Sequence, residues 1–79
     1  MEKEMIFYFD KEGDILDISM GKPREAISEE IDDDFLVRKD VKTGEVIGFT
    51  ILNFEKRFEI KKTEKIPIEG TFRLSKISA

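Results

Sequence analysis

Short runs of strand-forming residues alternate with polar turns, and this rhythm constrains the fold more than any other feature of the chain. The runs span residues 5–9, 15–20, 27–31, 35–39 and 45–52. The last of them, EVIGFTIL, is the strongest strand former because β-branched and aromatic residues dominate it. Two of the separators, residues 10–14 and 40–44, are acidic and are expected to be plain turns. Five short strands with short turns predict an antiparallel meander.

A trial register tests this meander, because side chains opposite one another on antiparallel strands share a face. The register that gathers the large apolar residues pairs Phe9 with Leu16, Met20 with Ile27, Ile31 with Phe35, Phe35 with Ile51 and Lys39 with Ile47. Nearly all large apolar side chains then lie on one face, with Glu29 and Lys39 at its margin. The second face mixes polar residues with apolar ones such as Leu36, and we expect it to be solvated or to form half of a homodimer interface.

A short helix is expected to cover the apolar face. Asn53 is a favoured N-cap residue, and Phe54 and Phe58 lie on one helical face at a spacing of i, i+4. Strict alternation of Phe54, Phe58 and Ile60 also fits a strand. Both alternatives stand for residues 54–60, and we favour the helix.

The remaining tail is compatible with more than one structure. Pro67 is expected to end any helix or strand that precedes it. Residues 71–77 alternate in a way that fits a further strand, and they could equally form an arm. The expected fold is therefore α+β: an antiparallel five-stranded meander with one short helix packed on one face and a C-terminal strand or arm. The length suits one domain, residues 1–79, with one modest core.

The composition narrows the classes of function. Charged residues make up 41% of the chain and the net charge is −4, without the basic excess of a typical nucleic-acid binder. The absence of Cys and His removes thiolate chemistry and the commonest general base. No apolar run has the length of a signal-peptide core or a membrane span, so we expect a cytoplasmic protein. Abundant Glu and Lys resemble a thermophile's surface.

The run FDKEGDILDISM resembles the first hairpin of a prokaryotic family, domain of unknown function 2283. The run SEEIDDDFLVRKDVKTGEVIGFTILN resembles the family's second half, and the resemblance covers about residues 5–53. The matching positions are Asp10, Asp14, Leu16, Asp32, Val37, Asp40, Gly44, Val46, Gly48, Ile51 and Leu52. No activity is established for the family, and some members resemble the antitoxin half of toxin–antitoxin pairs. The resemblance therefore implies a fold and, at most, an antitoxin-like role.

Three consecutive aspartates, Asp32, Asp33 and Asp34, fall where the expected sheet ends beside Asn53. Calcium binds carboxylate and amide oxygens, so these four residues predict a weak divalent-cation site. Aspartate is also favoured in turns, and an acid stabilises a nearby helix N-terminus. A patch that recognises a basic partner is a third interpretation.

The segment 56–65 is rich in lysine and interleaved with phenylalanine. This pattern suits nucleic-acid binding, and it equally suits an amphipathic helix with solvated lysines. The sequence as a whole predicts a small non-enzymatic protein–protein interaction module with an unidentified protein partner. A weak calcium site at Asp32–Asp34 is the first alternative, and an antitoxin-like or nucleic-acid role through residues 56–65 is the second. We expect no membrane partner and no cofactor beyond weakly bound calcium.

Overall fold

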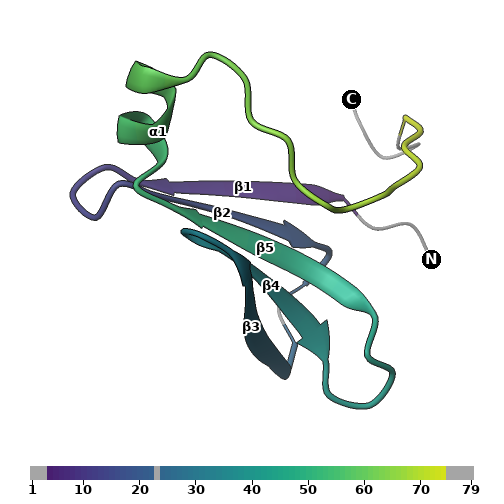
Figure 1. The fold of residues 1–79 in the computed structure, drawn as a ribbon. Helices are drawn as coiled ribbons and strands as arrows, with labels where there is room; N and C mark the ends of the chain where they lie inside the picture. The colour runs from purple at the N-terminus through teal and green to yellow at the C-terminus, as the bar shows by residue number, and fades with distance from the viewer. Residues whose placement is uncertain (1–3, 23, 75–79) are drawn as a thin grey trace.

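An open, twisted antiparallel sheet of five strands carries one short helix at one end (Figure 1). The computed structural model describes residues 4–22 and 24–74. The elements are β1 (Met5–Asp10), β2 (Ile15–Met20), β3 (Ala26–Asp32), β4 (Phe35–Asp40), β5 (Val46–Leu52) and α1 (Phe54–Ile60). The predicted α+β fold, with five antiparallel strands and one short helix, is confirmed.

The order of the strands corrects the predicted meander. The order is β1-β2-β5-β4-β3, so β5 lies at the centre of the sheet. Strand β2 pairs with β5 and not with β3, and the predicted pair of Met20 with Ile27 does not form. The strongest strand former, β5, takes the central position of the sheet. The acid-rich strand β3 lies at an edge, where charged residues are tolerated.

Within each hairpin the predicted register holds over most of its length. Phe9 lies opposite Leu16, and Phe35 lies opposite Ile51. Two irregularities displace the other predicted pairs: Phe35 faces Asp32 in place of Ile31, and Lys39 faces Val46 in place of Ile47. Each is a bulge that adds one residue to one strand, which a pattern of period two does not reveal.

The core lies on the face that the sequence predicted to be apolar. The buried side chains are Ile18, Phe35, Val37 and Ile47. The ring of Phe35 packs edge-on against Phe49 with centroids 5.6 Å apart. All of these residues belong to β2, β4 and β5, so the core sits under the middle of the sheet and not under its edges.

Residues 54–60 form a helix, which settles the choice between helix and strand in favour of the helix. Phe54 packs edge-on against Phe9 at 5.8 Å, and Phe58 packs against Phe54 at 5.1 Å. Helix α1 therefore covers the end of the sheet beside the β1–β2 turn (Figure 1).

The tail that follows α1 is irregular over residues 61–74. It runs from the helix back toward the start of β1 (Figure 1). Residues 71–74 form an arm and not a strand, and the rest of the predicted 71–77 segment lies outside the described residues.

Candidate interaction surface

Strand β1 is an edge strand whose apolar side chains are all exposed. Its exposed fractions are 38% for Met5, 48% for Ile6, 60% for Phe7, 64% for Tyr8 and 39% for Phe9. Successive residues of a strand point to opposite faces, so both faces of β1 present apolar groups. The predicted pair of Phe9 with Leu16 puts Phe9 on the apolar face, together with Phe7 opposite Ile18. The sequence sign of this exposed edge is the run of five consecutive apolar residues from Met5 to Phe9, and the structure adds that β1 has a single neighbouring strand among the described residues.

Within residues 4–22 and 24–74, no strand pairs with the outer side of the β1 backbone. The Glu4 carbonyl accepts a hydrogen bond from the Gly21 N–H at 2.8 Å, which makes these two residues a hydrogen-bonded pair of the β1–β2 ladder. Hydrogen-bonded and non-hydrogen-bonded pairs alternate along an antiparallel ladder. The residues whose N–H and C=O groups point away from β2 are therefore Met5, Phe7 and Phe9.

The opposite edge of the sheet is protected against pairing. Strand β3 exposes Glu29, Glu30 and Asp32, and a bulge interrupts its register between Glu30 and Asp32. Charged residues and bulges on an edge strand discourage pairing with another chain. Strand β1 has no charged residue between Met5 and Phe9. The two edges of this open sheet therefore differ in their capacity to accept another strand.

An apolar groove of about 900 Å³ adjoins the start of β1, between the sheet and the tail. The side chains that line it include Met5, Met20, Phe49, Ile66, Ile68 and Phe72. Phe72 and Leu74, both on the tail, are 70% and 94% exposed. The groove extends the apolar surface of β1 toward the C-terminal arm.

The second face of the sheet carries a polar network at its centre. Arg38 donates hydrogen bonds to Asp17, to the Thr50 hydroxyl at 3.2 Å and to the Ser19 hydroxyl at 2.8 Å. Thr50 also donates to Asp17 at 2.8 Å. Gly48 lies beneath the guanidinium, and a Cβ there would collide with Arg38. The glycine within a strong strand was the sequence signal for this close approach. The predicted homodimer through this face stays a prediction.

The predicted cation site lies at the β3–β4 turn. Asp32 ends β3, Asp34 adopts a left-handed backbone with φ of 60°, and Asn53 donates its amide to Asp34 at 3.2 Å. Arg57 lies 3.6 Å from the same carboxylate and donates to the Asp33 carbonyl at 3.0 Å. The Asp34 carboxylate therefore accepts a hydrogen bond from Asn53 and forms an ion pair with Arg57. In the part of the chain that the structure describes, no group of three or more acidic side chains could hold a metal ion. A calcium site at these residues stays a prediction.

The acid that caps α1 is Asp14 and not one of the three aspartates. Its carboxylate accepts the backbone N–H of Glu55 at 2.7 Å and that of Lys56 at 3.3 Å, while its carbonyl accepts Phe54 N–H at 2.9 Å. Asn53 holds the N-cap position with φ of 54° and makes no side-chain cap bond. The predicted start of the helix is correct, but the capping side chain comes from the β1–β2 turn.

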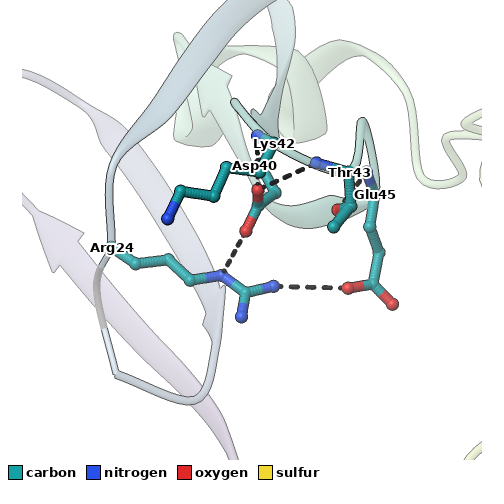
Figure 2. Close-up of polar contacts among 5 residues, drawn as sticks. All are labelled: Arg24, Asp40, Lys42, Thr43 and Glu45. Atoms are coloured by element: carbon teal, nitrogen blue, oxygen red, sulfur yellow. Dashed lines mark hydrogen bonds and ion pairs between the residues drawn. The ribbon is translucent and has the colours of Figure 1, made fainter.

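The β4–β5 turn is the plain turn that the sequence predicted. Figure 2 shows the Asp40 carboxylate accepting the N–H of Lys42 at 2.7 Å and that of Thr43 at 3.1 Å. Arg24, which precedes β3, reaches Asp40 at 3.1 Å and Glu45 at 3.3 Å. The Lys42 and Thr43 N–H groups, helped by the Arg24 charge, hold the pKa of Asp40 below its ordinary value. The ion pairs fasten the β2–β3 connection to this turn.

The basic segment 56–65 is partly engaged within the chain. Arg57 pairs with Glu64 at 2.5 Å as well as with Asp34. Lys56 and Lys61 are exposed, as an amphipathic helix predicts. A nucleic-acid role for this segment stays a prediction.

Comparison with known proteins identifies the family and nothing more specific. Among the described residues no helix is long and apolar enough to cross a membrane. No curated protein and no solved structure shows a significant match to this chain. The family model described as protein of unknown function (DUF2283) matches residues 6–54, which span β1 to the start of α1. The chain therefore belongs to the DUF2283 family.

Proposed function

We propose that this chain is a non-enzymatic, cytoplasmic protein–protein interaction module that binds its partner through the free edge of β1. One observation carries the proposal: β1 exposes apolar side chains on both faces and leaves the backbone groups of Met5, Phe7 and Phe9 free of β2. Proteins protect edge strands that have no partner, and an exposed apolar edge favours pairing with another chain. The contrast with the charged edge of β3 supports this choice.

The chemical inventory of the chain agrees with binding. The chain has no Cys and no His, so the side chains that most often serve as nucleophile and general base near neutral pH are missing. Its net charge of −4 favours a protein partner over a nucleic acid.

A site-specific cross-linking experiment tests the proposal. A photo-reactive amino acid replaces Phe7 in one version of the chain and Ile27 in another, and both are irradiated in living cells. These positions are matched, because Phe7 is 60% exposed on one edge and Ile27 is 61% exposed on the other. We expect protein adducts at position 7 in clear excess over those at position 27. Equal yields at the two positions, or no adducts at position 7, would contradict a binding role for β1.

A further inference from the structure

We propose that the partner at β1 is a second copy of this chain, an inference that rests on the proposed function. The two copies would join as an antiparallel β1–β1 pair. Their two-fold axis would pass between Phe7 of one copy and Phe7 of the other, which is called here an axis at Phe7. The pair would extend each sheet across the axis into one continuous sheet. Most homodimers have two-fold symmetry, in which the same surface patch of each copy contacts its counterpart.

The direction of the backbone groups favours an axis at Phe7. A residue on the axis of an antiparallel pair that exchanges hydrogen bonds with its own copy must point its N–H and C=O outward. Ile6 and Tyr8 point theirs toward β2, whereas Phe7 points outward and lies at the middle of the strand. An axis at Phe7 lets every outward-pointing residue from Met5 to Phe9 exchange hydrogen bonds with the partner.

The side chains of β1 are complementary to themselves in this register. Phe7 faces the partner's Phe7, Met5 faces the partner's Phe9, and Ile6 faces the partner's Tyr8. Every apolar residue of the strand therefore meets an apolar residue on the same face. Aromatic and other apolar side chains that lie opposite each other on antiparallel strands stabilise the pairing.

The pattern of exposure favours pairing at the edge over stacking of one face. A partner stacked on one face would cover Phe7 or Tyr8 but not both, because these neighbours point to opposite faces. Both are among the most exposed large apolar side chains of the sheet, at 60% and 64%. A strand added at the edge contacts side chains on both faces at once.

The exposed area is enough for a dimer of modest affinity. With about 200 Å² for a large side chain, the apolar residues of β1 leave roughly 500 Å² exposed on each chain. Weak interfaces bury less than about 1,200 Å² in total, or about 600 Å² on each partner. Phe72 and Leu74 on the adjoining arm add apolar area near Met5. The dimer is therefore expected to form at micromolar or higher concentration.

The ends of the strand supply a test that is specific to this register. An axis at Phe7 places Glu4 opposite the partner's Asp10, so carboxylates face each other at both ends of the pair. Like charges directly opposite each other weaken a strand pair. Replacing Glu4 with lysine converts both repulsive contacts into ion pairs. Another axis would not bring these two positions together.

Sedimentation velocity of the full chain over a wide concentration range tests the proposal. The wild-type chain is expected to pass from monomer to dimer as its concentration rises toward millimolar. Phe7→Lys sets two lysines against each other on the axis and should raise the dissociation constant about tenfold or more, whereas Ile27→Lys on the other edge should leave it unchanged. Circular dichroism checks that both variants keep the wild-type fold.

Glu4→Lys should lower the dissociation constant roughly three- to tenfold, while Glu25→Lys, with the same change of charge outside β1, should not. A wild-type chain that stays monomeric at the highest concentration would overturn the proposal. A dimer unaffected by both Phe7→Lys and Glu4→Lys would overturn it as well. A third outcome separates the two proposals. If the purified chain is monomeric and the adducts at position 7 contain a different protein, self-pairing is overturned but the proposed interaction role is not.

Discussion

Arg38 on β4 lies across Gly48 on the central strand, and through this contact β4 is tied to β2. The guanidinium reaches Asp17 and Ser19 only because no side chain stands at position 48. The Arg38 and Asp17 side chains are 25% and 31% exposed, so the ion pair is partly shielded from water. Three neighbouring strands of the sheet are thus joined on the face opposite the core.

Gly48→Ala is expected to destabilise the protein by about 2 kcal/mol. The new Cβ would meet the carbonyl oxygen of Ile18 as well as the Arg38 guanidinium, and the backbone contact is the harder one to relieve. Urea unfolding followed by circular dichroism measures the change. Gly13→Ala is the control, because its Cβ would meet only the ends of the Asp10 and Ile15 side chains. Equal losses for the two variants would contradict this account of Gly48.

Asp14→Asn is expected to cost roughly 0.3–1 kcal/mol of stability, because the N-terminus of α1 loses the negative charge that accepts its N–H groups. Asparagine tolerates the left-handed backbone that Asp14 adopts, so the change isolates the cap. The Glu55 and Lys56 amides should also exchange faster with solvent. Asp33→Asn makes the same chemical change in an exposed turn residue and should have little effect. If Asp33→Asn destabilised the protein as much as Asp14→Asn, the capping role would be wrong.

Acid is expected to weaken the turn that Asp40 organises. The pKa of Asp40 is lowered in the folded protein, chiefly because its carboxylate accepts the Lys42 and Thr43 N–H groups. A lowered pKa stabilises the folded state fully above the carboxyl's ordinary pKa, and this stabilisation is lost as the pH falls through the folded-state value. The stability advantage of the wild-type chain over Asp40→Asn should therefore disappear in strong acid. A carbon-detected NMR titration of the Asp40 carboxyl checks the direction of the shift.

An amide NMR titration with calcium and magnesium tests the predicted cation site. Because Arg57 and the Asn53 amide direct donors at Asp34, we expect the site to be weak, with saturable shifts at Asp32–Asp34 only at high cation concentration. Arg57→Gln removes the competing charge and should strengthen any binding there. Saturable shifts confined to this turn and Asn53 would establish the site, whereas diffuse shifts or none would contradict it, and equal affinities for the wild-type chain and Arg57→Gln would contradict a competing effect of Arg57.

The strands and the helix were predictable because their signals are local. Alternation of apolar residues, the acidic turns and the Phe54–Phe58 spacing each act within a few residues of the chain. The central position of β5 was not predictable in this way. It depends on which strand is most favoured at the position that has neighbouring strands on both sides, and this involves all the strands together. The bulge at Ile31 and the bulge at Ile47 likewise leave no mark on a period-two pattern.

The candidate surface was harder to predict than the fold. The predicted register put Phe7 and Phe9 on the apolar face, but burial also requires a neighbour on each side. Once β1 lies at an edge, these side chains stay exposed. The capping role of Asp14 was equally hidden, because Asp14 and Glu55 are 41 residues apart in the chain.

Hydrogen exchange at single β1 amides tests the central claim most directly. At low protein concentration, the Phe7 N–H should exchange rapidly while the neighbouring Ile6 and Tyr8 N–H groups are protected by β2. At high concentration the Phe7 N–H should become protected as well, because the partner strand accepts it. Rapid exchange of the Phe7 amide at every concentration would contradict a β1–β1 pair.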